Sequence, residues 1–210
     1  MQRGIQVTKK RHTVDGFEAT VGTNHIGHFL LVKLLQDRVK RVISVCSETQ
    51  DPAERTGLPP PNVTSLDELA KGYNKFNPQE AYTTSKLLNI LHVKELARRS
   101  PEGPEVIAYT PGFTPGTSLT REHPKVLVPI VMAIMRLVFW CRSVRVSSIA
   151  YSGGHMASIA AADSLEAHGW HSGNYINIDR VMNPSSLACD PVLSKALWGK
   201  SEEWVRPFAN

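Results

Sequence analysis

Two short apolar segments on either side of a long helical pattern constrain the fold of this chain more than any other feature. Residues 41–47 (RVISVCS) and 106–109 (VIAY) are rich in β-branched side chains and apolar on both faces, which is typical of buried parallel strands. Between them, Asn77 precedes Pro78 and Glu80, so an N-cap, a first helical residue and an acidic first turn follow in the right order. A strand, a helix and a second strand in this order predict an α/β fold with a parallel sheet.

The rest of the chain adds helices and one more strand to this unit. Residues 15–18 (DGFE) match a capping box with Asp15 as the N-cap, and they predict a helix that runs to about residue 36. Gly22 and Gly27 lie inside that helix, where each costs about 1 kcal/mol relative to alanine, so they predict close backbone packing or a local break. Shorter patterns predict a helix at 65–71, a helix at 145–162, a strand at 175–178 and a polar tail after it. With 210 residues and no internal repeat, residues 1–210 are predicted to form a single domain.

The composition excludes several classes of protein. A hydrophobic fraction of 41% and a charged fraction of 20% are ordinary for a soluble globular protein and argue against a disordered or fibrous chain. The net charge is +5, but the basic residues are scattered, so no nucleic-acid partner is predicted, whereas an anionic small ligand is compatible. Cys46, Cys141 and Cys189 are widely spaced, which argues against a disulfide framework and predicts an intracellular compartment, cytoplasmic or organellar. His25 and His28 lie three residues apart, but no third ligand follows at a telling spacing, so no metal site is predicted.

Residues 125–140 form a strongly apolar segment. It is shorter than the roughly 20 residues that a membrane-spanning helix needs, and Pro129 and Arg136 interrupt it. We expect a buried helix or a lid over the substrate, and peripheral membrane contact through this segment is the alternative.

Polar residues are predicted to meet at the carboxyl edge of the sheet, where parallel α/β sheets bind their ligands. Ser47 ends the first strand, Pro111-Gly112 follows the second, and Tyr82 and Lys86 share one face of the helix between them. A neighbouring ammonium is expected to lower the pKa of Tyr82 from its ordinary value of about 10. The phenol could then exchange a proton with a carbonyl or alcohol oxygen that Ser47 orients. The alternative is an unrelated surface tyrosine and lysine, with a serine that caps a turn.

These residues, together with residues 23–29 (TNHIGHF), resemble the short-chain dehydrogenase/reductase family from about residue 14 to about residue 204. The segments DGFEATVGTNHIGHFLL and PGTSLTREH are most similar to the protochlorophyllide-reductase-like and retinol-dehydrogenase-like members. The resemblance implies a Rossmann-type doubly wound parallel sheet. It also implies an oxidoreductase that moves a hydride between NADP or NAD, with NADP favoured, and a bulky apolar carbonyl or alcohol. A homo-oligomer is compatible with it.

The resemblance further implies a catalytic tetrad of Asn24, Ser47, Tyr82 and Lys86. The helix would break at Asn24, so that its backbone carbonyl holds a water molecule of the proton relay. Ser47 would polarise the substrate carbonyl and Tyr82 would donate the proton. Lys86 would bind the nicotinamide ribose and lower the pKa of Tyr82.

Cofactor contacts and two departures from the family complete the expectations. Pro111, Gly112 and Thr117 would line the nicotinamide, although the loop around Thr117 does not fix its register. The strand and Gly-rich turn with which the family cradles the cofactor pyrophosphate have no counterpart in the sequence. We therefore expect the C-terminal portion of such a sheet, with the N-terminal strands missing and weak nucleotide binding, and a binding or scaffold remnant is the alternative function. Leu88 stands where the pigment-reducing members carry a cysteine, which argues against that specific activity.

Overall fold

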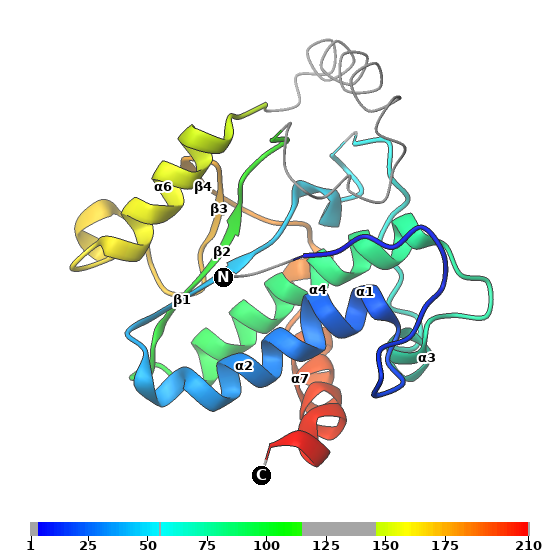
Figure 1. Cartoon of the computed structure of the whole chain (residues 1–210). Coiled ribbons are helices and arrows are strands. Elements are labelled where there is room, and N and C mark those ends of the chain that lie inside the picture. The colour runs from blue at the N-terminus through cyan, green and yellow to red at the C-terminus, as the bar shows by residue number, and fades with distance from the viewer. Residues whose placement is uncertain (1–3, 55, 115–145, 210) are drawn as a thin grey trace.

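A four-stranded sheet forms the centre of the computed structural model, which describes residues 4–54, 56–114 and 146–209 (Figure 1). Its strands, in their spatial order, are β1 (Arg41–Val45), β2 (Glu105–Thr110), β3 (Tyr175–Asn177) and β4 (Arg180–Met182). The first three are parallel and β4 is antiparallel to β3. The predicted α/β class and parallel sheet are confirmed, whereas β4 was not predicted.

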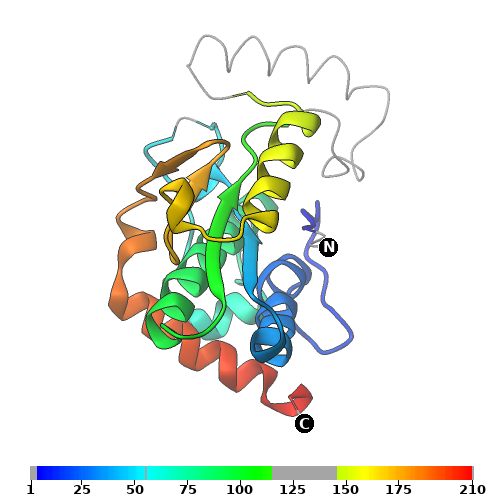
Figure 2. The same ribbon diagram turned by 90° about the vertical axis from the view of Figure 1, so that its left-hand side faces the viewer.

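Helices cover both faces of this sheet. The α-helices are α1 (Ala19–Val21), α2 (Gly27–Leu35), α3 (Leu66–Lys71), α4 (Pro78–Arg99), α6 (Ile149–Ala161) and α7 (Pro191–Val205). The π-helical turn η1 (Gly22–Ile26) joins α1 to α2, and the 3₁₀ turns are η2 (Gln36–Arg38), η3 (Glu48–Gln50), η5 (Glu166–His168), η6 (Leu187–Cys189) and η7 (Arg206–Phe208). Figure 2 shows α6 on one side of the sheet and α2 and α4 on the other, with α7 packed outside α4. This arrangement confirms the doubly wound topology over the described residues.

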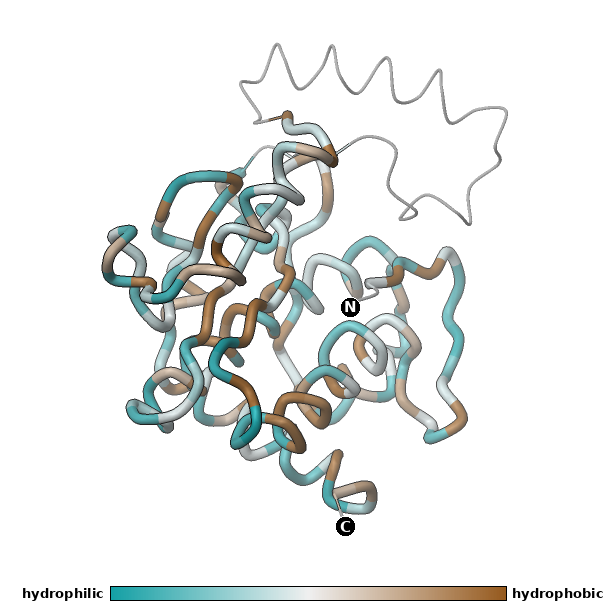
Figure 3. The backbone as a smooth tube through the Cα atoms, turned by 60° about the vertical axis from the view of Figure 1, so that its left-hand side comes forward, coloured by the Kyte–Doolittle hydropathy of each residue, from teal (hydrophilic) through white to brown (hydrophobic). Residues whose placement is uncertain are grey.

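The alternating side chains of β2 separate the core into two parts. Val106 and Ala108 point into the larger cluster, which α4 and α7 share with the turn at the start of α2. Ile107 and Tyr109 point to the opposite face, where Ile159 of α6 closes a smaller cluster. The hydropathy colouring in Figure 3 accordingly shows apolar residues along the central strands. The side chains on both faces of β2 are therefore buried, as its unbroken apolar sequence predicts.

Helix α4 begins and ends as the sequence predicts. The Asn77 side chain accepts hydrogen bonds from the backbone N–H groups of Gln79 and Glu80, and Pro78 occupies the first helical position. The helix spans 22 residues and ends at Arg99, before Ser100. Fifteen of its residues are buried, so it is the central helix of the larger core cluster rather than a surface helix.

The predicted capping box at residues 15–18 was wrong. Gly16 has a φ of +83° and turns the chain, and Glu18 itself caps α1 by accepting hydrogen bonds from the N–H groups of Thr20 and Val21. The glycine-based prediction was correct, because η1 interrupts the helix at Gly22. A Cβ atom at Gly22 would lie 3.0 Å from the Thr13 side chain, so close packing also requires this glycine.

The polar tail predicted after the third strand is instead the helix α7. Asp190 caps it by accepting from the N–H groups of Val192 and Leu193, and Pro191 fills the first position. Leu197 and Val205 are buried, and the helix packs along α4. Among the helices that the structure describes, none is both long and apolar enough to cross a membrane. The apolar segment 125–140 lies outside the described residues.

Candidate active site

Ser47 and Tyr82 meet at the carboxyl end of β1. Cys46 continues the pairing of β1 through its N–H, which donates to the Tyr109 carbonyl at 2.7 Å, and Ser47 is the next residue. Ser47 caps η3, since its hydroxyl oxygen accepts from the Thr49 N–H at 3.3 Å. The Tyr82 side chain lies close to Ser47, whose side chain acts to lower the pKa of the phenol. The structure thus brings together two residues that lie 35 positions apart in the sequence, as the strand–helix topology predicts.

Burial sets the protonation state of Tyr82. Its side chain is 7% exposed, and burial raises its pKa to about 12, while the neighbouring Ser47 side chain acts in the opposite direction. The Lys86 ammonium lies 5.5 Å from the centroid of the phenol ring, over its face rather than at its hydroxyl. The expectation that Lys86 lowers this pKa was therefore wrong for the geometry seen here, and Tyr82 is protonated at neutral pH.

Lys86 is a buried ammonium with a single acceptor among the described residues. Its Nζ donates to the Val45 carbonyl at 3.2 Å, and the Asn89 amide donates to the same oxygen at 3.3 Å. The side chain is 5% exposed, and burial lowers its pKa, while the nearby Cys46 raises it. An ammonium has three donors. Within the described part of the chain, no hydrogen bond is formed by the other two.

Asn24 lies in the middle of the π-helical turn η1. Its side-chain amide accepts from the Ile5 N–H and donates to the Ile5 carbonyl, both at 2.8 Å. The same Nδ2 donates to Ser85 Oγ at 3.0 Å, and the Asn24 carbonyl is 2.9 Å from His28 Nδ1. The helix is thus locally altered at Asn24, as the resemblance implies. The Asn24 side chain holds the N-terminal segment around Ile5 beside α4.

The Pro111-Gly112 turn follows β2 at the same edge of the sheet. Gly112 has a φ of +69°, a conformation that favours glycine. The Ser152 hydroxyl of α6 donates to the Pro111 carbonyl at 2.7 Å, and the Thr114 hydroxyl donates to the Gly112 carbonyl at 2.9 Å. Thr117, the remaining predicted cofactor contact, lies outside the described residues.

Comparisons with known proteins agree with this arrangement. The chain is 32% identical over 217 residues to "Protochlorophyllide reductase, chloroplastic" of Daucus carota, a match that covers 92% of the chain and 54% of that protein. It is 33% identical over 205 residues to the "WW domain-containing oxidoreductase" of Danio rerio, with 93% and 46% covered. A crystal structure of an uncharacterised protein from Mycobacterium paratuberculosis superposes with a TM-score of 0.64 at 26% identity and covers 97% of this chain and 64% of that one. No family profile matches the chain.

Similarity over more than nine-tenths of the chain, together with Ser47, Tyr82 and Lys86 at one strand end, decides the family. The chain belongs to the short-chain dehydrogenase/reductase family. It spans about half the length of the curated relatives that it matches.

Three residues of this short-chain dehydrogenase/reductase support the site but were not singled out in the sequence. Ser85 bonds Asn24, Asn89 shares the Val45 carbonyl with Lys86, and Ser152 holds Pro111. The position of Asn89, three residues after Lys86 and so on nearly the same helix face, was a signal that could have identified it. Ser152 carries no such signal, because its proximity to Pro111 arises from tertiary packing.

Other residues weighed in the sequence have structural roles. Leu88 is fully buried in the larger core cluster, and Cys46 is a buried free thiol whose pKa is raised to about 12 by burial. His25 Nε2 lies 2.9 Å from Ser201 Oγ, inside the core. Over the part of the chain that the structure describes, no group of three or more His, Cys, Asp or Glu side chains could hold a metal ion.

Proposed function

We propose that this chain is part of an oxidoreductase that transfers a hydride between NAD(P)(H) and a bulky apolar carbonyl or alcohol. The observation that carries the proposal is the proximity of Ser47 and Tyr82 to each other and to the buried Lys86 ammonium, at the carboxyl end of a parallel strand. Both named relatives are oxidoreductases by their printed descriptions, which supports the reaction class.

The residues present fit the nicotinamide half of the cofactor. Two donors of the Lys86 ammonium have no acceptor among the described residues, and they suit the vicinal hydroxyl groups of a ribose. Gly112 has no side chain to obstruct a flat ring at the end of β2, and Ser152 holds the adjacent Pro111 carbonyl in place. The bound nicotinamide would supply the hydride. We favour NADP(H) over NAD(H), and a direct comparison of the two nucleotides tests that preference.

The protonation state of Tyr82 favours carbonyl reduction. With a pKa of about 12, the phenol carries its proton at neutral pH and can donate it to the oxygen of a carbonyl substrate. The Ser47 hydroxyl, which lies close to Tyr82, can donate to the same oxygen and stabilise the negative charge that develops there. The alcohol product leaves with the Tyr82 proton, and the phenolate must regain one before the next turnover. The expected apolar character of the substrate rests on the sequence of residues 125–140.

The test compares Tyr82→Phe with Tyr73→Phe in the longest natural protein that contains these 210 residues. Tyr73 is the matched control, because its hydroxyl bonds the Ser65 carbonyl next to α3, away from Ser47 and Lys86. Using bulky apolar aldehydes and ketones as substrates, we expect Tyr82→Phe to lower turnover by a factor of about 10² to 10⁴ and to leave nucleotide affinity nearly unchanged. Tyr73→Phe should keep wild-type turnover.

The result that would overturn the proposal is equal turnover of Tyr82→Phe and wild type with every substrate that the protein reduces. Nucleotide binding without turnover in any of the proteins would instead favour the alternative role of a binding or scaffold protein. Isothermal calorimetry with NADPH and NADH supplies the affinities.

A further inference from the structure

We propose that Ser152, near the start of α6, is a positioning residue for the nicotinamide ring of the bound nucleotide, and that Ser147 directs its hydroxyl. Ser152 supports the Pro111-Gly112 turn from the side of α6 and does not itself contact the ligand. The inference rests on the proposed function, because it names a residue that controls how the same site holds its cofactor.

The turn after β2 depends on support from outside. Proline has no backbone N–H to donate, and Gly112, with a φ of +69°, is the residue type with the greatest conformational freedom. The two carbonyl groups are therefore the natural points of attachment. The Pro111 carbonyl accepts from the Ser152 hydroxyl at 2.7 Å, and the Gly112 carbonyl accepts from the Thr114 hydroxyl at 2.9 Å. Thr114 belongs to the same loop, so of these two bonds only that of Ser152 connects the turn to another element.

The Ser152 hydroxyl does not bond as a serine inside a helix commonly does. Such a hydroxyl often donates to a carbonyl three or four residues back along its own helix. Ser158 of α6 does so, since it donates to the His155 carbonyl at 2.7 Å. Ser152 instead donates outside the helix. The helix does not need this bond in order to begin, because Ser148 caps it by accepting from the Tyr151 N–H at 3.1 Å. The hydroxyl therefore serves the turn rather than the helix.

A second serine determines the direction of this hydroxyl. Ser147 Oγ lies 2.6 Å from Ser152 Oγ. Each hydroxyl has one proton, and Ser152 gives its own to the Pro111 carbonyl, so Ser147 is the donor in the bond between the two serines. The Tyr109 hydroxyl donates to the Ser152 carbonyl at 2.9 Å, which ties the helix to the end of β2. Both the backbone and the hydroxyl of Ser152 are thus fixed before a ligand binds.

The pattern of exposure places the ligand on the turn and the serine behind it. Ser152 is 3% exposed, whereas Pro111 and Gly112 are partly exposed. A turn that is already fixed loses little conformational entropy when a ligand binds to it. Loss of the Ser152 hydroxyl should therefore lower the affinity for the ring that meets this turn. It should leave the contribution of the phosphate and adenosine portions of the nucleotide unchanged.

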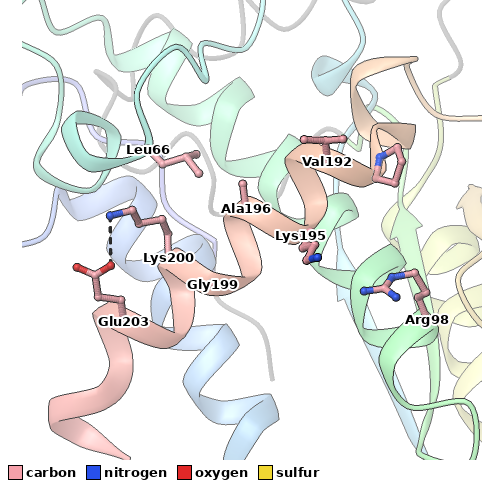
Figure 4. A pocket seen from close by; sticks show the side chains of 9 residues that line it. Leu66, Arg98, Val192, Lys195, Ala196, Gly199, Lys200 and Glu203 are labelled. Carbon is pink, nitrogen blue, oxygen red and sulfur yellow. Dashed lines mark hydrogen bonds and ion pairs between the residues drawn. The ribbon is translucent and has the colours of Figure 1, made fainter.

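A groove of about 970 Å³ along α7 is an alternative place for an anionic nucleotide (Figure 4). Lys195 and Lys200 line it, but neither Tyr82 nor Lys86 does. A nucleotide bound in this groove would lose affinity in Lys195→Glu and would not respond to Ser152→Ala. We expect the reverse for both variants.

Isothermal calorimetry with two ligands tests the proposal in the longest natural protein that contains these 210 residues. The ligands are NADPH and 2′-phospho-ADP-ribose, which lacks only the nicotinamide ring. Ser152→Ala should weaken NADPH binding about three- to tenfold and leave the affinity for 2′-phospho-ADP-ribose unchanged. Ser147→Ala should weaken NADPH binding less, because the bond from Ser152 to the turn remains. Ser158→Ala is the matched control, since its hydroxyl bonds within α6, and it should change neither affinity.

A measurement without nucleotide supports the same test. Amide hydrogen exchange of residues 109–114 should be faster in Ser152→Ala than in Ser158→Ala. Equal weakening of both ligands by Ser152→Ala, or of neither, would overturn the proposal, and equal weakening would indicate a general structural role. A wild-type protein that binds the two ligands with equal affinity would refute the nicotinamide site itself and, with it, the proposed function.

Discussion

Acidification should destabilise this protein through two histidines that its core keeps neutral. His25 and His92 are 1% and 7% exposed, and their ring centroids lie 6.0 Å apart. Burial lowers the pKa of His25 to about 3, with a further lowering by His92, and burial lowers the pKa of His92 to about 4. In the unfolded chain both imidazoles regain a pKa of about 6.5.

The sign and size of the effect follow from these values. Below about pH 6.5 both histidines become protonated in the unfolded chain but stay neutral in the native state. The stability present at neutral pH is therefore lost as the pH falls toward 4 and then 3. Each histidine contributes about 1.4 kcal/mol per pH unit in this window. From pH 7 to pH 5 the two together should lower the free energy of unfolding by about 4 kcal/mol.

Urea unfolding at pH 7, 6 and 5, followed by tryptophan fluorescence, measures this loss. His92→Phe removes one titrating group and keeps an aromatic ring at this position. The ring centroid of His92 lies 5.0 Å from that of Phe29 and 5.7 Å from that of Trp198. The variant should lose about 2 kcal/mol less than wild type between pH 7 and pH 5. His171→Phe, at an exposed histidine, should lose as much as wild type. Equal losses in wild type and His92→Phe would refute the reasoning.

Three further outcomes are expected from the site. Lys86→Ala should reduce both turnover and nucleotide affinity, in contrast to Tyr82→Phe, because its ammonium is available to a ligand, and calorimetry combined with steady-state kinetics separates the two effects. Asn24→Ala should lower the free energy of unfolding in urea by about 1–3 kcal/mol, because the Ile5 N–H and carbonyl both lose their partner; an unchanged midpoint would contradict this. The rate of carbonyl reduction should stay constant from about pH 7 to about pH 10, since Tyr82 with a pKa of about 12 remains protonated, and a decline centred near pH 8 would contradict that value.

The central strand–helix–strand unit could be predicted because its signals are local. Asn77, Pro78 and the apolar residues of α4 specify that helix without reference to the rest of the chain. Its topology then brings Ser47 and Tyr82 together, so the position of the site followed from two strands and one helix.

What could not be predicted depends on tertiary contacts. The apolar residues of α7 are few and interrupted by charges, and only packing against α4 makes Leu197 a core residue. The orientation of Lys86 toward the Val45 carbonyl, rather than toward the Tyr82 hydroxyl, depends on where the end of β1 lies relative to α4. The predicted lowering of the Tyr82 pKa was wrong because the spacing of Tyr82 and Lys86 in the sequence does not reveal how deeply the phenol is buried.

The π-helical turn η1 also fixes the rotational phase of the helix that follows it. The Gly27 N–H donates to the Gly22 carbonyl, five residues back, and a Cβ at Gly27 would lie 3.3 Å from that oxygen. Such a turn holds one residue more than an α-helical turn, and one residue corresponds to about 100° of rotation. Because the wide turn absorbs this extra residue, the helix after it keeps the phase in which Phe29 is buried in the core. A residue lost inside η1 should therefore leave the direction of Phe29 unchanged, whereas a residue lost between Gly27 and Phe29 would rotate the later part of α2 by about 100°.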